Sequence, residues 1–498
     1  MRADERPGLA GDRGPEVDSF YHLKDCALAG KACNGTACFA ARQLNPERWA
    51  EAAKQTPRVY CLGKCFAAPA HADEEPARPP FEVRAREGIV LGRLARGGAR
   101  SLERYLALDG YRGLEAALAT PPDAAIRAVE AAGLRGRGGA AFPTGRKLRA
   151  VRHQPGAEKF VVANADEGDA GAYIDRFLLE DDPFSLLEGM TIAAYAVGAA
   201  KGWIYLRAEY PAARPMIEAA LVEARAAGLL GESILGREFG FDVELVIGQG
   251  SYLCGEETAL LNSIEGRRPE VRARPPFPTE RGLWGRPTLV NNVETFVNLP
   301  WILRRGGEAY HALGFANSRG TKVVSLNSLF HRPGLYEVEF GVSVRHLVEE
   351  LGGGLRGSAP LKGVLIGGPL AGIIPPWLLD TPFGFEELRT IGAGVGHGGV
   401  VAFDERTSIV ELAQHVFAFG AYESCGKCTP CRLGSRRLEE FFTAAASGEV
   451  VLDSQAEEAR RVVDALRLTS LCGHGVGLGE FAASAWRYYG KELSAWSR

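Results

Sequence analysis

Four cysteines in the last quarter of the chain have the spacing of an iron-sulfur ligand set. Cys425, Cys428 and Cys431 lie three residues apart, and Cys472 follows much later. Three thiolates at this spacing can bind three corners of a 4Fe-4S cluster from one tight loop, and a remote thiolate can bind the fourth corner. Structural zinc and unligated thiols are the alternatives, but zinc sites usually pair two C-x2-C groups. The set predicts a 4Fe-4S cluster, which carries single electrons.

A glycine-rich stretch from Gly133 to Lys147 could hold an anion. Its five glycines let backbone N–H groups approach a phosphate closely, and Lys147 and nearby arginines supply positive charge. The pattern Gly136-x-Gly138-x-x-Ala141 is similar to a dinucleotide fingerprint, but that fingerprint follows a strand, whereas this stretch follows a predicted helix. It is not a Walker A loop either, because no Ser or Thr follows the lysine. We interpret it as a phosphate-binding loop of another kind, with a flexible linker as the alternative.

Two acidic motifs complete the residues that could do chemistry. Asn164-Ala-Asp-Glu-Gly-Asp169 directly follows a predicted strand, so its polar groups should lie at a strand's carboxyl end, where ligands of α/β folds collect. Tyr252-Leu-Cys-Gly-Glu-Glu-Thr258 places two adjacent carboxylates after a glycine turn. Carboxylates suit ribose hydroxyls and the edge of an isoalloxazine ring. A solvated acidic loop is the alternative for each motif, and it becomes less favoured when both share a chain with a phosphate loop.

The composition is that of a globular protein with several domains. With 498 residues, 46% of them hydrophobic and 24% charged, the chain should form about three or four domains. No segment approaches the roughly 20 apolar residues that span a bilayer, and Met1–Asp18 lacks an apolar signal core, so we expect a cytoplasmic protein. Ten cysteines in such a protein favour metal ligation over disulfides. A formal net charge of -3 gives no indication of nucleic-acid binding.

Periodicity predicts the elements that position these motifs. The expected helices and strands that flank the motifs have apolar spacings of about 3.6 and 2 residues, or are short continuous apolar runs. We expect helices over 123–133 and 183–200, strands over 159–163, 322–326 and 334–339, and a mostly helical segment over 407–489. A glycine ends the first of these helices, where a left-handed cap would lie.

Six motifs, in this order, resemble the flavoprotein subunit of respiratory NADH:quinone oxidoreductase. The same module serves as the diaphorase subunit of NAD-reducing hydrogenases and NAD-dependent formate dehydrogenases. The resemblance covers about residues 114–489. The motifs are Gly136-Arg-Gly-Gly-Ala, Asn164-Ala-Asp-Glu, Cys254-Gly-Glu-Glu-Thr, Pro275-Pro-Phe-Pro, Asn291-Asn-Val-Glu-Thr295 and Ser424-Cys-Gly-Lys-Cys.

The resemblance implies an FMN site and an NAD(H) site that share residues. The implied FMN contacts are Gly136, Arg137, Gly138, Lys147, Asn164, Asp166, Tyr252, Gly255, Glu256, Asn291, Asn292 and Thr295. The implied nicotinamide-dinucleotide contacts are Gly139, Phe142, Lys147, Glu167, Asp169, Glu257, Arg274 and Phe277. NADH would give hydride to the flavin, which would pass single electrons to iron-sulfur clusters. Glu167 and Glu257, near the ring edge, are the expected catalytic residues, acting by position.

A second cysteine set near the start of the chain is similar to the 2Fe-2S site of a thioredoxin-like partner subunit. It consists of Cys33 and Cys38, then Cys61 and Cys65, with 22 residues between the pairs. The resemblance implies a helix over 46–54 and a strand over 58–60 between the two pairs. The interval is shorter than in the family, so the domain would be truncated. Zinc and an interaction domain that has lost its metal remain alternatives. Cys26 is left over and is expected to be an unligated thiol, and Cys254 is expected to pack in the core.

The resulting fold class is α/β multidomain, with four kinds of domain. We expect a tail (1–18), a truncated thioredoxin-like 2Fe-2S domain (19–70), a linker and lead-in segment (71–113), a Rossmann-like FMN- and NADH-binding domain (114–320), a ubiquitin-like SLBB β-grasp domain (321–405) and a helical 4Fe-4S domain (406–498).

The expected function is that of an NADH dehydrogenase or diaphorase subunit, most similar to those of formate dehydrogenase or hydrogenase. Its expected partners are a thioredoxin-like 2Fe-2S subunit and a larger iron-sulfur or catalytic subunit. The alternatives are a subunit of an electron-bifurcating complex and a catalytically silent relay or scaffold. Asp169 is shorter than the family's glutamate and Arg274 replaces a lysine, from which we hypothesise weak or dual use of NADP.

Overall fold

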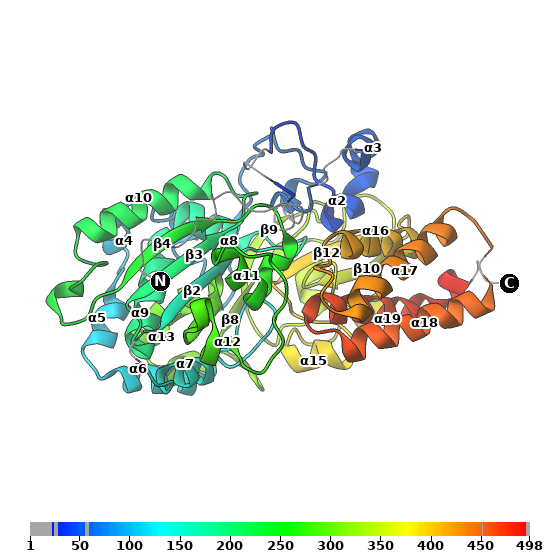
Figure 1. Cartoon of the computed structure of the whole chain (residues 1–498). Helices are drawn as coiled ribbons and strands as arrows, with labels where there is room; N and C mark the ends of the chain where they lie inside the picture. Colours follow the sequence, from blue (N-terminus) through cyan, green and yellow to red (C-terminus); the bar gives the residue numbers. More distant parts are fainter. Residues whose placement is uncertain (1–21, 24–27, 55–58, 157, 451, 495–498) are drawn as a thin grey trace.

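The computed structural model describes residues 22–23, 28–54, 59–156, 158–450 and 452–494 (Figure 1). The expected tail and Cys26 therefore lie outside the described residues. The architecture is mixed α/β, with a parallel sheet and a C-terminal helical region, as the sequence predicts. Among the helices described, none is both long and apolar enough to cross a membrane.

A four-stranded parallel sheet forms the middle of the chain, in the order β4-β3-β2-β5. The strands are β2 (Phe160–Ala165), β3 (Lys201–Leu206), β4 (Asp242–Ile247) and β5 (Thr288–Asn292). Nearly all residues of β2 and β3 are buried, as expected for a parallel sheet that is covered by helices on both faces. The carboxyl ends of all four strands point to the same edge.

Helices surround this sheet and connect its strands. The long apolar helix expected over 183–200 is α9 (Pro183–Val197), buried along almost its whole length and packed against α13 (Val293–Arg305). The other helices of this part are α4 (Leu102–Ala107), α5 (Arg112–Leu118), α6 (Pro122–Ala132), α7 (Thr144–Arg152), α8 (Ile174–Asp181), α10 (Ala213–Ala226), α11 (Glu257–Ile264), α12 (Pro278–Arg281) and α14 (Gly307–His311). Gly133 caps α6 with a φ of 66°, the left-handed conformation that the sequence predicts.

A second, six-stranded sheet follows, in the order β1-β9-β8-β12-β10-β11. It contains β8 (Thr321–Leu326), β9 (Gly334–Glu339), β10 (Leu361–Ile366), β11 (Ile373–Ile374) and β12 (Gly399–Asp404), with the helix α15 (Phe385–Thr390). The edge strand β1 (Phe81–Val83) pairs in parallel with β9. The segment expected as a linker thus contributes a strand to this sheet. The hairpin β6 (Gly314–Phe315) and β7 (Ser318–Arg319) precedes it.

Four helices form the C-terminal region, drawn from ochre to red in Figure 1: α16 (Ile409–Tyr422), α17 (Thr429–Ala446), α18 (Asp453–Thr469) and α19 (Gly473–Ser494). The N-terminal segment, in blue, forms α2 (Thr36–Ala40) and α3 (Pro46–Lys54) and lies above the junction of the parallel sheet and these helices. The helix over 46–54 matches its expected bounds. Of the strand expected over 58–60, the described part contributes an isolated parallel bridge between Val59 and Cys33.

Candidate functional site

Three of the predicted motifs meet at the carboxyl edge of the parallel sheet. The acidic motif that begins at Asn164 follows β2, the motif around Tyr252 follows β4, and Asn291 and Asn292 end β5. Asn164 ties two of them together, because its Nδ2 donates to the carbonyl of Gly255 at 2.8 Å. Parallel pairing explains this convergence, since it brings residues far apart in sequence to one edge.

The glycine-rich loop between α6 and α7 closes against the same edge. Its ends are tied by the N–H of Gly136, which donates to the carbonyl of Phe142 at 2.9 Å. Gly138 lies so near Asn292 that a Cβ there would be 2.8 Å from the Asn292 Cβ. Ala141 has a φ of 54°, a conformation that favours glycine. The loop is therefore a tight turn packed on β5, unlike a flexible linker.

The side chain of Arg137 is turned away from this loop. It is fully buried, and its Nη2 donates to the Tyr310 hydroxyl at 2.8 Å and to the carbonyl of Arg319 at 2.7 Å. Its guanidinium also lies over the ring of Phe340, 4.9 Å from the centroid. Only its backbone N–H faces the motif, where it donates to Thr295 Oγ1 at 2.8 Å. A direct contact of the guanidinium with a flavin phosphate, as the sequence suggested, does not fit this orientation.

Several polar groups at the edge fit a flavin. Asn291 is buried, and its Nδ2 has no hydrogen-bond partner in the protein. Asp166 is buried, and desolvation raises the pKa of its carboxyl well above the ordinary value. A Cβ on Gly255 would lie 3.4 Å from Asp166 Oδ2, so glycine keeps this approach open. A heterocycle with N–H and carbonyl groups would satisfy both side chains.

Four charged residues form one ion-pair network beside these groups. Glu257 Oε2 lies 3.2 Å from Lys147 Nζ, and its Oε1 lies 3.1 Å from Arg274 Nη1. Arg274 also pairs with Glu256, whose carboxylate caps α11 by accepting from the N–H groups of Thr258 and Ala259. The positive charge of Arg274 is thus shared between two carboxylates.

Two aromatic rings near this network are exposed. Phe142 is 48% exposed and Phe277 is 50% exposed, values that are unusual for phenylalanine in a folded chain. The resemblance assigns both residues to the dinucleotide site. Exposed rings of this kind are suited to stacking on a base or a nicotinamide.

Glu167, by contrast, is buried below the edge. Its carboxylate accepts hydrogen bonds from the N–H groups of Asp175 at 3.1 Å and Arg176 at 3.2 Å, at the start of α8, and from the Tyr210 hydroxyl at 2.9 Å. Desolvation, and then the nearby carboxylate of Asp175, raise the pKa of Glu167 to about 7, although the imidazole of His397 opposes this shift. The two expected catalytic glutamates therefore have different environments.

Asp169 and Tyr252 also point inward. The Tyr252 hydroxyl donates to Asp169 Oδ1 at 3.2 Å, and the N–H of His397 donates to Asp169 Oδ2 at 3.2 Å. Burial raises the pKa of the Asp169 carboxyl, and these donors oppose the rise. Asp169 thus ties the acidic motif to the loop before β12.

The four C-terminal cysteines converge from three helix ends. Cys428 is the residue before α17, Cys431 lies in its first turn, and Cys472 directly precedes α19. Cys425 and Cys472 pack in one apolar cluster with Leu253, close to the Tyr252 motif. Burial raises the pKa of Cys431 to about 12, so a positively charged metal centre would be needed to hold this sulfur as a thiolate.

The four N-terminal cysteines are all buried and lie together. The sulfurs of Cys61 and Cys65 are 3.5 Å apart, and Cys33 accepts a hydrogen bond from the N–H of Gly35 at 3.4 Å. The thiol of Cys38 donates to Cys33 and, with backbone donors, lowers the pKa of Cys33 to about 6 against the effect of burial. A stabilised thiolate is suited to metal ligation.

Neither cysteine set has the compact spacing of a zinc site. Tetrahedral Zn–S bonds of about 2.3 Å place each pair of sulfurs about 3.8 Å apart. Within the described part of the chain, no three cysteine sulfurs lie within 4.8 Å of one another. Cys254 belongs to neither set and is buried in the core beside β3, as expected.

Sequence reasoning missed the residues that surround Glu167. His397, Asp175, Tyr210 and Arg207 all contact Glu167, and none was singled out. The signal for His397 was present, because it is a lone histidine within Gly392-Ala-Gly-Val-Gly-His-Gly-Gly399. Asp175 lies in α8, and Arg207 and Tyr210 come just after β3. The local sequence around these three residues did not indicate a functional role.

Comparisons with known proteins match this arrangement. Residues 129–301 match the Nuo51 FMN-binding domain, and residues 411–496 match the NADH-ubiquinone oxidoreductase-F iron-sulfur binding region. The NADP-reducing hydrogenase subunit HndC of Solidesulfovibrio fructosivorans is 42% identical over 75% of this chain and 76% of its own length. The F subunit of the Escherichia coli NADH-quinone oxidoreductase is 38% identical over 79% of this chain and 89% of its own.

A solved structure extends the similarity to nearly the whole chain. It is the crystal structure of an NAD+-reducing [NiFe]-hydrogenase in the air-oxidized state. The match covers 97% of this chain and 88% of that chain, with a TM-score of 0.81 and 30% sequence identity. The similarity therefore includes the N-terminal segment that the two family models leave out.

Proposed function

Because the chain belongs to the family of NADH-binding flavoprotein subunits of NADH:quinone oxidoreductases and NAD-reducing hydrogenases, we propose that it connects one flavin to two iron-sulfur centres. The family members are diaphorase subunits of multisubunit oxidoreductases that use FMN, NADH and a 4Fe-4S cluster. The observation that carries the proposal is the position of the flavin motifs, which lie between two sets of four cysteines.

We assign the flavin to the carboxyl edge of the parallel sheet. The loop backbone at Gly136 and Gly138 would hold the phosphate, and Asp166, Asn291 and Asn292 would bind the ring. The remaining residues of the proposed flavin site are Asn164, Tyr252, Gly255, Glu256, Thr295, Lys147 and the backbone of Arg137. Bound FMN supplies the conversion between hydride transfer and single-electron transfer. The support is the unpartnered amide of Asn291 and the cradle left by Gly255.

The dinucleotide would lie over this edge, where the exposed rings and the charge network meet. The exposed rings of Phe142 and Phe277 would stack on the rings of the dinucleotide. Its phosphates would face Lys147 and Arg274, both of which form ion pairs with Glu257. Gly139 would allow close approach, and Glu167 and Asp169 would support the site from below. Precise stacking of the nicotinamide is the role of these residues, since hydride transfer needs no side-chain acid or base.

We propose that Cys425, Cys428, Cys431 and Cys472 bind the 4Fe-4S cluster. We also propose that Cys33, Cys38, Cys61 and Cys65 bind a 2Fe-2S cluster in a truncated thioredoxin-like unit. The convergence of four buried thiols and the low pKa of Cys33 support the second assignment. The six-stranded sheet would correspond to a ubiquitin-like SLBB domain, between a Rossmann-like flavin domain and a helical cluster domain.

The physiological setting that we propose is a cytoplasmic complex of the formate dehydrogenase or hydrogenase type. A thioredoxin-like 2Fe-2S subunit and a larger iron-sulfur or catalytic subunit would be its partners. The similarity to subunits of an NADP-reducing and an NAD+-reducing hydrogenase supports the hydrogenase setting. Purification of the native complex and identification of its subunits would test it.

An anaerobic NADH titration of the FMN-reconstituted chain, with low-temperature EPR on the same samples, tests the function. We expect the flavin to bleach and a 4Fe-4S signal to grow with added NADH. A further 2Fe-2S signal, with NADH or dithionite, would support the N-terminal site. Reduction by dithionite alone, with no response to NADH, would instead identify a silent relay subunit.

A further inference from the structure

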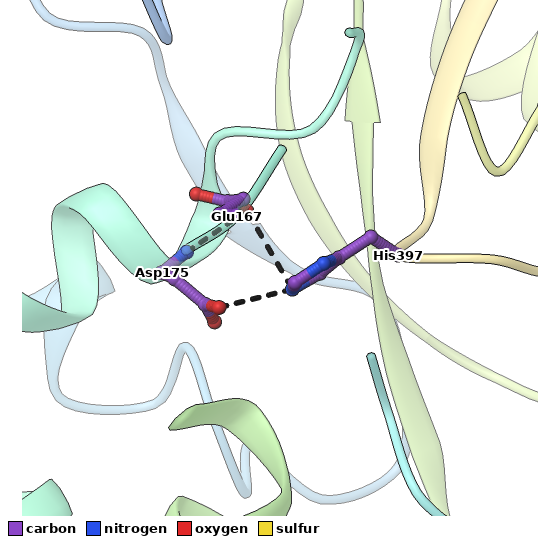
Figure 2. Close-up of side chains that lie close together, drawn as sticks. All are labelled: Glu167, Asp175 and His397. Atoms are coloured by element: carbon purple, nitrogen blue, oxygen red, sulfur yellow. Dashed lines mark hydrogen bonds and ion pairs between the residues drawn. The ribbon is translucent and has the colours of Figure 1, made fainter. Parts of the chain in front are cut away.

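A buried histidine and two buried carboxylates meet below the proposed flavin site (Figure 2). His397 Nε2 lies 3.0 Å from Asp175 Oδ2 and 3.9 Å from Glu167 Oε1. The side chain of His397 is 7% exposed and those of both carboxylates are 0% exposed. The three residues come from the loop before β12, from α8 and from the loop after β2, so only the tertiary structure unites them. We call them the acid–base cluster.

The surroundings fix the cluster and set its charge. Tyr210 and two N–H groups of α8 donate to Glu167, whereas Asp175 Oδ1 is buried without a hydrogen-bond partner. Lys322 donates to the carbonyl of His397 at 3.0 Å, and its ammonium is itself paired with Glu294. The other charged groups that face the cluster are Asp169, which accepts from the N–H of His397, Arg176 beside Asp175, and Arg207, which donates to the carbonyl of Glu167.

Two carboxylates and one imidazole in so little space must share protons. Burial by itself lowers the pKa of His397, but the carboxylates of Asp175 and Glu167 raise it to about 9. The pKa of Glu167 is raised to about 7 by burial and by Asp175. The cluster can therefore gain or lose a proton near neutral pH.

Asn292 joins the cluster to the proposed flavin site. Its Nδ2 lies 2.9 Å from His397 Nε2, and the residue stands at the end of β5 beside the glycine loop. Glu167 belongs to the same short motif as Asn164 and Asp166. Because Asn292 is itself assigned to the flavin ring, His397 and Asp175 directly contact a residue of the proposed flavin site.

We propose that the cluster of His397, Asp175 and Glu167 accepts the proton that leaves the flavin when its electrons pass to the iron-sulfur centres. The inference rests on the proposed function. Bound FMN would supply the conversion between hydride and single electrons, and its oxidation would release two electrons and one proton. The electrons would pass singly to an acceptor, and the cluster would take up the proton. In reduction of NAD+ the cluster would supply the same proton. His397 is a positioning and proton-holding residue, because it acts through Asn292 and Glu167.

The test separates the two half-reactions of the FMN-loaded full chain by rapid mixing. His397→Gln is mixed first with NADH and then, once reduced, with ferricyanide as a one-electron acceptor. We expect flavin bleaching by NADH to stay within about twofold of the wild type, because hydride transfer releases no proton to the protein. Reoxidation should slow by about 10²-fold, as general acid–base catalysis contributes about 10²–10⁴. His346→Gln, a surface histidine on the six-stranded sheet domain, is the matched control and should match the wild type.

The pH profile distinguishes proton transfer from a structural effect. Reoxidation of the wild type should accelerate as pH rises through the pKa of the acceptor, and His397→Gln should lose this dependence. Unchanged reoxidation and an unchanged profile in His397→Gln, with normal bleaching, would overturn the inference alone. If NADH does not bleach the flavin of the wild type, that result would instead contradict the proposed function.

A measurement on the chain without flavin tests the inference even if His397→Gln fails to bind FMN. With 13C-labelled histidine, the His397 signal should titrate above the ordinary value of 6.5, and Asp175→Asn should lower its midpoint. A midpoint at or below 6.5 in the wild type would overturn the inference. The same three ligand atoms could instead bind a divalent metal, and one equivalent of metal in the wild type that His397→Gln loses would also overturn it.

Discussion

At the scale of single residues, burial separates side chains that look equivalent in the sequence. Glu167 and Glu257 are both glutamates of the predicted site, but the side chain of Glu257 is 22% exposed and paired with two cations, whereas that of Glu167 is wholly buried. The charge of Glu257 is screened and compensated. The charge of Glu167 depends on the protons of its neighbours. The first is suited to binding, and the second to holding a proton.

The acid–base cluster should make folding stability depend on pH. The pKa of His397 is about 9 in the folded chain against an ordinary 6.5, so the folded state binds its proton more tightly. This contribution is fully present below pH 6.5 and is lost as pH rises through about 9. In urea unfolding at a series of pH values, the wild type should lose stability over this range and His397→Gln should lose much less. Equal slopes for wild type and variant would contradict this assignment, and His346→Gln should keep the wild-type slope.

Charge compensation at Arg274 should favour NADH over NADPH. Glu256 and Glu257 neutralise Arg274, so Arg274 offers no uncompensated positive charge to a 2'-phosphate. The inward orientation of Asp169 adds no cation to the site. We expect kcat/KM for NADPH to be about 10²-fold below that for NADH, because like charges at an interface cost several kcal/mol. Glu257→Gln should narrow the gap, and the surface variant Glu232→Gln should not. Equal kcat/KM values for the two nucleotides in the wild type would support the dual use hypothesised from the sequence.

At the scale of elements, two glycine-rich loops from different parts of the chain meet. A Cβ added to Gly139 of the glycine-rich loop would lie 3.5 Å from the Cα of Gly396, in the loop that carries His397. Gly396 itself packs on Gly367, at the end of β10. The position of His397 therefore depends on close backbone contact between three loops, which only glycine allows.

Replacement of Gly396 tests this contact against a matched glycine. Gly396 and Gly392 both have positive φ, but a Cβ at Gly396 would lie 2.1 Å from the Cα of Gly367, whereas a Cβ at Gly392 meets nothing within 4 Å. Gly392→Ala should cost about 1–2 kcal/mol of unfolding free energy from backbone strain alone. Gly396→Ala should cost more and should also weaken FMN binding, measured by fluorescence titration. Equal effects of the two variants would show that the contact is unimportant.

The helix ends that carry the C-terminal cysteines should bind one cluster between them. Cys428→Ser should remove the 4Fe-4S EPR signal and about four irons per chain, because it replaces one of the four thiolates proposed to hold the cluster with a weaker hydroxyl ligand. Cys254→Ser is the control, since Cys254 is buried but belongs to neither set. It should keep its iron, measured by colorimetric assay. Full iron content in Cys428→Ser would exclude this ligand set.

At the scale of the whole molecule, the six-stranded sheet and the N-terminal unit both pack on the flavin domain through buried charge. Lys322 of β8 pairs with Glu294 of α13, and both side chains are 0% exposed. Arg207 donates to the backbone carbonyls of both Glu167 and Cys61, so it bridges the flavin motif and the N-terminal cysteines. These contacts make one continuous structure from segments that a sequence divides into separate domains.

Breaking the buried ion pair between Lys322 and Glu294 should loosen β8 from α13. Lys322→Met leaves the Glu294 carboxylate buried without its partner, which should cost about 3–5 kcal/mol of unfolding free energy. The double variant Lys322→Met with Glu294→Met should cost less than the sum of the single changes, because both charges are gone. Urea unfolding of the four chains gives this cycle, with the exposed Lys201→Met as control. Strict additivity would show that the two side chains do not interact.

The amino-acid sequence by itself determined the chemistry that the chain can carry and most of its local structure. Cysteine spacing, the glycine loop and the acidic motifs identified the cofactors of the family, and the helix expected over 183–200, which is observed as Pro183–Val197, follows from its local apolar pattern. Tertiary structure decided where charge is buried. It turned the side chain of Arg137 away from the glycine-rich loop, buried Glu167 and brought His397 beside Asp175. Burial and long-range contact depend on how distant segments pack, which local patterns do not encode.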